Sequence, residues 1–91
     1  NEVVEKLTAD ICRAFNFSYN INIEMKFSEE GIPVPYDINP RIAASVAFCS
    51  AAGANLIYYA MQLALGEEIP ENIQIKEGVK MVRYLKEYYV K

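Results

Sequence analysis

The first fifteen residues have the apolar spacing of an amphipathic helix. Val3, Leu7, Ile11 and Phe15 recur at every fourth position, and most of the residues between them are polar or charged. Residues four apart lie on one face of a helix, so these four side chains form an apolar stripe. The pattern predicts a helix that ends at Asn16.

From residue 20 onward the apolar positions recur with a period of two. Apolar and polar residues alternate over residues 20–27, and the alternation starts again over residues 32–39. This period is typical of a half-buried β-strand. Glu30 and Gly31 lie between the two runs and favour a two-residue turn, so the sequence predicts an antiparallel hairpin.

The position of the turn predicts the pairing of the two strands. One face of the hairpin is expected to be apolar, with Glu29 opposite Ile32 at the tip, followed by the pairs Phe27 and Val34, Met25 and Tyr36, and Ile23 and Ile38. The other face is expected to collect Lys26 opposite Pro35, Glu24 opposite Asp37, and Asn22 opposite Asn39. In this register the nitrogens of Pro33 and Pro35 point away from the partner strand, so no ladder hydrogen bond is lost.

The second half of the chain carries signals for shorter elements. Residues 42–53 are rich in Ala and Ser, which suits a short, closely packed helix or loop. Asn55 is expected to cap a helix from Leu56 to Leu65 that Gly66 ends. The buried face of this helix is predicted to consist of Leu56, Tyr59, Ala60, Leu63 and Ala64.

Two further strands are predicted, at residues 73–75 and 79–90, although the basic residues leave a helix open for the second of these segments. Together the patterns predict an α+β fold in which helices pack on one face of an antiparallel sheet.

Composition narrows the function classes. The chain has 91 residues, of which 53% are hydrophobic, and this suits one compact unit spanning residues 1–91. A net charge of −3 argues against nucleic-acid binding. No apolar run is long enough for a membrane span, so we expect a cytoplasmic protein without a membrane partner.

Cys12 and Cys49 are expected to be free thiols. Because the chain opens with Asn1, we expect it to be a processed product, a proteolytic fragment or an expressed subdomain.

The polar face of the hairpin carries the candidate chemistry. Directly opposed residues on antiparallel strands have Cβ atoms about 4.5–5.5 Å apart, so the pair Glu24 and Asp37 brings two negative charges together. Such a pair shares a proton, leans into water or binds a cation. Asn22 and Asn39 lie beside it and add oxygen ligands of the kind that Mg²⁺ prefers. This face therefore has the composition of half a magnesium site.

Two basic residues flank these oxygen ligands. Lys26 and Arg41 could meet the phosphates that such a metal accompanies, with Asn22 beside them. The alternative is a solvated hairpin face on which Lys26 relieves the repulsion between the carboxylates. In that alternative residues 37–40 form a turn whose Asp and Asn side chains bond to the local backbone. The spacing by itself leaves both interpretations open.

The hairpin also resembles a known family. Residues 22–41 read NIEMKFSEEGIPVPYDINPR and are similar to the ATP-grasp segment in which a strand carrying Gln, Glu or Asp leads through a turn into Glu-Ile-Asn-Pro-Arg. Residues 51–56 and 63–70 resemble proteins close to the large subunit of carbamoyl phosphate synthetase. The resemblance covers about residues 15–90, and its specific part is the Asn-Pro-Arg hairpin.

The resemblance implies roles for particular residues. Glu24, Asp37 and Asn39 would hold the one or two Mg²⁺ (or Mn²⁺) ions that bridge the phosphates of ATP. Arg41 would stabilise the transferred phosphoryl group or bind the acid substrate. Asp37 stands where the family usually has Glu, so its shorter side chain is expected to weaken or shift one metal ligand.

The implied activity is that of an ATP-dependent carboxylate–amine ligase. A carboxylate attacks the γ-phosphate of ATP, and an amine, ammonia or another nucleophile displaces phosphate from the resulting acyl phosphate. The glycine-rich phosphate loop and the lysines over the nucleotide have no counterpart in residues 1–91. We therefore expect this chain to be the carboxyl-terminal subdomain of an ATP-grasp domain, to need the remainder of that domain, and to be inactive alone.

A second hypothesis assigns no chemistry to the chain. Tyr84, Tyr88 and Tyr89 would then pair with another chain, as in an oligomerisation or protein-binding module. An isolated fragment could also form a homodimer over surface that its missing half would cover.

Overall fold

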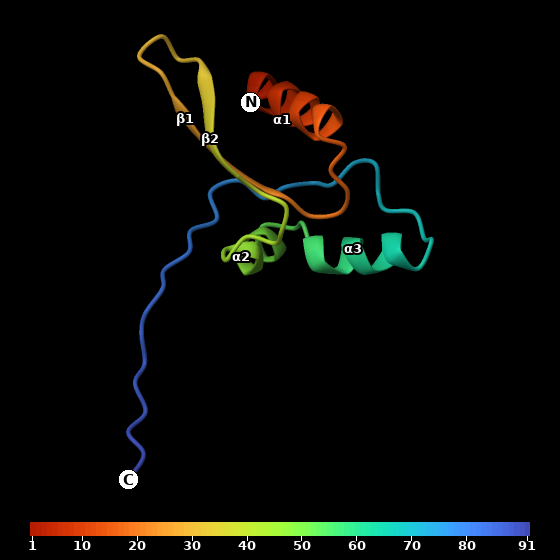
Figure 1. Ribbon diagram of the computed structural model, residues 1–91. Helices are drawn as coiled ribbons and strands as arrows, with labels where there is room; N and C mark the ends of the chain where they lie inside the picture. Colours follow the sequence, from red (N-terminus) through yellow and green to blue (C-terminus); the bar gives the residue numbers. More distant parts are fainter.

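The computed structural model describes residues 1–91, which form three helices and one two-stranded antiparallel sheet (Figure 1). This composition confirms the α+β class. None of the helices combines the length and apolar composition that a membrane span requires. In chain order the elements are α1 (Glu2–Ala14), β1 (Asn22–Phe27), β2 (Pro33–Asn39), α2 (Val46–Ala51) and α3 (Leu56–Ala64).

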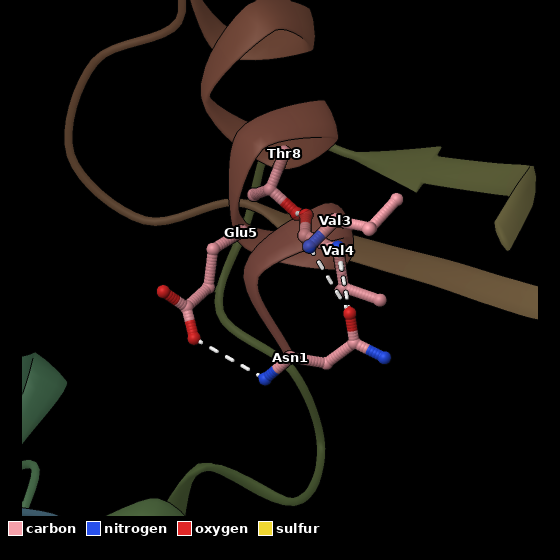
Figure 2. A network of polar contacts seen from close by, with 5 residues as sticks. All are labelled: Asn1, Val3, Val4, Glu5 and Thr8. Atoms are coloured by element: carbon pink, nitrogen blue, oxygen red, sulfur yellow. Dashed lines mark hydrogen bonds and ion pairs between the residues drawn. The ribbon is translucent and has the colours of Figure 1, made fainter.

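Helix α1 is closed at both ends by asparagine. The side-chain oxygen of Asn1 accepts hydrogen bonds from the backbone N–H groups of Val3 and Val4 at 3.1 and 3.4 Å (Figure 2). At the other end Asn16 has a positive φ of 52°, and its N–H donates to the carbonyl of Arg13. The two ends satisfy backbone groups that a helix leaves without partners. The predicted stop at Asn16 is confirmed.

Helix α3 begins and ends as its sequence predicts. The Asn55 side chain accepts from the backbone N–H of Tyr58 at 3.1 Å. Gly66 follows the helix with a φ of 77°, and its N–H donates to the carbonyl of Leu63. Of the predicted buried face, Leu56, Tyr59 and Ala60 are half-buried, whereas Leu63 and Ala64 are exposed.

The hairpin pairs as predicted only at its open end. The pairs Asn22–Asn39, Ile23–Ile38 and Glu24–Asp37 are present. A β-bulge follows between Glu24 and Met25, where Tyr36 is the extra residue of β2. Beyond the bulge the partners are Met25–Pro35, Lys26–Val34 and Phe27–Pro33, so the predicted pairs nearer the tip are wrong.

The cause of the shift is the loop, which has three residues instead of two. The N–H of Gly31 donates to the carbonyl of Ser28, and the N–H of Ser28 donates to the carbonyl of Ile32. Gly31 has a φ of 76°, as the last residue of a three-residue hairpin loop requires. This loop shifts the register by one residue, and the bulge at Tyr36 shifts it back before Glu24 and Asp37 meet.

The shift exchanges residues between the two faces of the tip. Pro33 is buried and Pro35 half-buried, whereas Val34 and Tyr36 are exposed, contrary to the predicted apolar pairs. Because hydrogen-bonded and non-hydrogen-bonded pairs alternate, Pro33 and Pro35 fall on non-hydrogen-bonded pairs in this register too. The ladder therefore tolerates both prolines.

The most closely packed backbone lies between α2 and α3. Ala52 and Ala54 are each 8% exposed, and the carbonyl of Ala52 accepts a hydrogen bond of 2.8 Å from the N–H of Lys76. A Cβ at Gly53 would lie 2.7 Å from the carbonyl oxygen of Gln74. The small residues thus allow the C-terminal segment to cross directly against residues 52–54.

The strands predicted at residues 73–75 and 79–90 are wrong, because residues 65–91 form no helix or strand. A strand forms only by pairing with another strand, and these residues pair with neither β1 nor β2, although each of the two has an unpaired outer edge. Most side chains of residues 65–91 are exposed, and the exposed fraction reaches 89% at Val82 and 99% at Leu85. Figure 1 shows the light blue part of this segment passing back among the other elements and its dark blue end running away from them.

Candidate functional site

The two predicted carboxylates are directly opposed on the hairpin. Glu24 on β1 pairs with Asp37 on β2, and both side chains are exposed. Each carboxylate accepts one hydrogen bond from a neutral donor. The Tyr36 hydroxyl donates to Glu24 Oε2 at 2.8 Å, and Asn39 Nδ2 donates to Asp37 Oδ2 at 2.7 Å. No cation of the protein forms an ion pair with either carboxylate.

The bulge is what brings Tyr36 to Glu24. As the extra residue of β2, it leaves the apolar face on which the two-residue turn would have placed it. The hydrogen bond to Glu24 raises the pKa of the Tyr36 phenol above its ordinary value. The phenol is therefore neutral near pH 7 and remains a donor to the carboxylate.

Lys26 lies over the ring of Tyr36 instead of bridging the carboxylates. Its Nζ atom is 5.1 Å from the ring centroid, within the range of a cation–π contact. Lys26 forms no ion pair, so its charge stays beside the polar face without neutralising either carboxylate.

Arg41 follows β2 and lies near β1. Its backbone N–H donates to the carbonyl of Asn39 at 2.8 Å, and its Nη1 atom donates to the carbonyl of Ile42 at 3.0 Å. Arg41 lines a pocket of about 370 Å³ together with Asn22 and Glu24. Asp37, Asn39 and Lys26 are outside the lining of this pocket.

The remaining lining residues were not predicted. The pocket is completed by Ala43, Ala44 and Ser45 from the loop before α2, and by Arg83 from the C-terminal segment. Arg83 Nη2 donates to the carbonyl of Ala44 at 3.2 Å. No spacing rule connects these two residues, because they are 39 positions apart in the sequence.

The sequence analysis also did not predict that Tyr36 contacts Glu24, although the position of the glycine in the hairpin loop could have indicated it. A three-residue hairpin loop has its glycine at the last position, and Gly31 fits that position if Glu29 is counted into the loop. The resulting shift of register requires a bulge before Glu24 and Asp37 can face each other.

The hairpin offers oxygen donors of the kind that magnesium prefers, but too few of them to complete its coordination. Glu24, Asp37 and the amide oxygen of Asn39 are hard oxygen donors on adjacent positions of the hairpin. No group of three or more His, Cys, Asp and Glu side chains gathers anywhere in residues 1–91. A cation here would therefore need phosphate oxygens and water to complete its coordination, which is how Mg²⁺ usually binds in phosphoryl-transfer sites.

Comparison with known proteins identifies the family. Residues 1–87 match the family described as "ATP-grasp in the biosynthetic pathway with Ter operon". Searches of curated proteins and of solved structures gave no significant match. The family match extends over nearly the whole chain and includes the hairpin, the pocket and Arg83. The chain therefore belongs to the ATP-grasp family of the biosynthetic pathway with the Ter operon, a family of ATP-dependent, ligase-type domains.

Proposed function

We propose that residues 1–91 supply the metal- and phosphate-binding portion of an ATP-dependent carboxylate–amine ligase. The observation that carries this proposal is the opposed pair Glu24 and Asp37, which no protein cation neutralises, beside a pocket lined by Arg41. Opposed like charges destabilise a sheet, and a bound divalent cation removes that cost. Glu24, Asp37 and Asn39 are the proposed ligands for Mg²⁺ or Mn²⁺, with ATP as co-substrate.

The proposed reaction has two steps. A carboxylate oxygen of the acid substrate attacks the γ-phosphorus of ATP, the bond to the β–γ bridging oxygen breaks, and ADP leaves. An amine nitrogen then attacks the carbonyl carbon of the acyl phosphate, inorganic phosphate leaves, and the nitrogen loses a proton. Bound Mg²⁺ would supply charge neutralisation for the phosphates.

The chain's own residues bind and orient the reactants in this scheme. Arg41 binds the transferred phosphoryl group or the substrate carboxylate, while Asn22 and Lys26 offer donors at the margin of the nucleotide phosphates. Tyr36 holds one oxygen of Glu24 in place. This acyl phosphate chemistry would be like that of the carbamoyl phosphate synthetase large subunit, whose segments residues 51–56 and 63–70 resemble.

We also propose that these residues act within a larger ATP-grasp domain and are inactive alone. The support is the exposed apolar surface of the chain, because a stable domain buries most such side chains. The alternative, a non-catalytic oligomerisation or protein-binding module, would use the same surface, including Tyr84, Tyr88 and Tyr89.

Replacing both carboxylates tests the metal site. In the protein as its gene encodes it, the double substitution Glu24→Gln and Asp37→Asn keeps acceptors for the hydrogen bonds from Tyr36 and Asn39. Without metal the variant should be more stable by about 0.5 kcal/mol, because the cross-strand repulsion is gone. Mg²⁺ should raise the unfolding midpoint of the wild type but not of the variant. Thermal unfolding with EDTA or Mg²⁺ measures both effects.

The matched control is the double substitution Glu29→Gln and Glu30→Gln at the tip of the same hairpin. It removes the same charge away from the site, so Mg²⁺ protection should persist. If the Glu24 and Asp37 variant keeps the wild-type Mg²⁺ response, the magnesium proposal is wrong and the binding-module alternative gains.

A further inference from the structure

The arginines of the chain divide into one that is paired and two that are not. Arg13 Nη1 forms an ion pair with Asp10 Oδ1 at 3.1 Å on the surface of α1. Arg41 and Arg83 have no carboxylate oxygen within 4.0 Å. Both of these arginines instead line the same pocket.

The two unpaired guanidinium groups are anchored on one short loop. Arg41 Nη1 donates to the carbonyl of Ile42, and Arg83 Nη2 donates to the carbonyl of Ala44. A neutral carbonyl holds a guanidinium in position but leaves its positive charge uncompensated. The loop thus brings together two positive charges from segments far apart in the sequence.

The pocket that both arginines line is open to solvent and has polar groups in its wall. Its volume is about 370 Å³, and Asn22 and Ser45 add neutral hydrogen-bonding groups to its wall. Glu24 is its only carboxylate, so the side chains that line it carry a net positive charge. Two arginines around such a space are the usual means of binding an oxyanion through several charge-assisted hydrogen bonds.

Arg83 can occupy this place because residues 52–54 hold the C-terminal segment. The N–H of Lys76 donates to the carbonyl of Ala52, and the absence of a side chain at Gly53 allows the close approach of Gln74. The segment then continues to Arg83, which reaches across to Ala44.

We propose that Arg83 is a second anion-binding residue of the site and acts with Arg41 on one oxyanion group of the substrates. This proposal deepens the proposed function and rests on it for the identity of the anion, which is the transferred phosphoryl group of ATP or the carboxylate of the acid substrate. The positive pair itself requires no metal.

Anion titrations without metal test the role of Arg83. The protein as its gene encodes it is titrated with inorganic phosphate, and separately with acetate, in EDTA at low ionic strength, by calorimetry. Arg83→Gln should weaken binding of at least one anion about tenfold, because a charge-assisted hydrogen bond is lost. Arg83→Lys should recover part of this loss. The control Arg13→Gln removes the same charge from α1 and should leave both affinities unchanged.

The pattern of the two titrations identifies the source of the anion. A loss confined to phosphate assigns Arg83 to the phosphoryl group, and a loss confined to acetate assigns it to the acid substrate. If Arg83→Gln binds both anions as the wild type does, or if neither anion binds the wild type, the proposal is overturned.

The anion titrations and the Mg²⁺ unfolding measurement together separate this proposal from the magnesium site. The Glu24→Gln and Asp37→Asn variant lacks Mg²⁺ protection if the proposed function holds, whereas its phosphate binding in EDTA depends on Arg41 and Arg83. A dependence on Arg83 without any Mg²⁺ effect would overturn the metal site alone. Mg²⁺ protection without a dependence on Arg83 would overturn only the second anion-binding residue.

Discussion

At the scale of single residues, the site is organised by neutral groups that hold charged ones. Tyr36 donates to Glu24 and Asn39 donates to Asp37, so each carboxylate has one oriented oxygen. Hydrogen bonds of this kind around a metal ligand fix its direction and tune its affinity. In the proposed magnesium site Tyr36 would be a positioning residue, and its hydrogen bond to Glu24 has a signature that can be measured without substrate.

The pKa of Tyr36 should depend on the charge of Glu24. The hydrogen bond to the carboxylate raises this pKa in the folded protein, so the neutral phenol is stabilised. That contribution is present below the pKa of an unfolded tyrosine, about 10, and is lost as the pH rises through the higher folded value. Glu24→Gln should lower the Tyr36 pKa toward the ordinary value, as followed by NMR of tyrosine labelled at Cζ.

Tyr89 is the internal control for this measurement. Its pKa is also raised, by a hydrogen bond to Glu87, and it is far from the hairpin in sequence. It should not respond to Glu24→Gln, and Tyr36→Phe identifies which resonance belongs to Tyr36. An unchanged Tyr36 pKa in Glu24→Gln would contradict the hydrogen bond between them.

At the scale of the elements, two irregularities of the hairpin offset each other. The three-residue loop shifts the register by one, and the bulge shifts it back, so Glu24 still faces Asp37. The carboxylate pair was therefore predicted correctly from a turn that was predicted wrongly. Tyr36 was missed for the same reason, because the bulged residue has no place in a regular alternation.

The crossing of the C-terminal segment over residues 52–54 depends on Gly53. A Cβ there would lie 2.7 Å from the backbone oxygen of Gln74, and the residue has a φ of 111°. Gly53→Ala should therefore cost more than about 2 kcal/mol. It should also release the Lys76 amide from its hydrogen bond to Ala52. Urea unfolding and hydrogen exchange of the Lys76 N–H measure the two effects.

Gly31→Ala is the matched control for this substitution. Gly31 has a positive φ of 76°, but a Cβ added there would have no other atom of the fold within 4 Å. Its loss of stability should be about 1 kcal/mol, without a change at Lys76. Equal effects of the two substitutions would mean that the close approach to Gln74 contributes nothing.

At the scale of the whole molecule, the chain is much more open than a domain of its length. Its radius of gyration is 16.1 Å, against about 12 Å for a compact domain of this size. Only 3 of 91 residues are buried, and exposed large apolar side chains occur from Val3 to Val90. Val3 of the α1 stripe and the tyrosines Tyr84, Tyr88 and Tyr89 thus stay exposed, although their pattern predicts partners.

This open surface leads to a prediction about the parent protein. The intact mass of the freshly purified gene product should be well above the 10.3 kDa of these residues, because a larger ATP-grasp domain would cover the apolar surface. The isolated 91-residue chain should bind a hydrophobic dye strongly, and the larger product should bind it weakly per residue. A product of 10.3 kDa would favour the oligomerisation module instead.

Local chemistry was enough to predict the parts of the fold that depend on neighbouring residues. The cap at Asn55, the stops at Asn16 and Gly66, and the hairpin itself all rest on interactions within a few residues along the chain. The family resemblance was carried by such a local segment too, residues 22–41. The ATP-grasp family is confirmed, while the closeness to carbamoyl phosphate synthetase stays a prediction.

The tertiary structure alone decided where distant residues meet. The Val and Tyr content of residues 79–90 predicts a strand, yet the path of the chain leaves this segment unpaired, and β1 and β2 bond only to each other. Arg83 joins Arg41 because Gly53 allows the chain to cross at Gln74, a contact that no periodicity contains. The sequence by itself thus determined the hairpin with its opposed carboxylates, and the three-dimensional path of the chain determined the second guanidinium of the pocket.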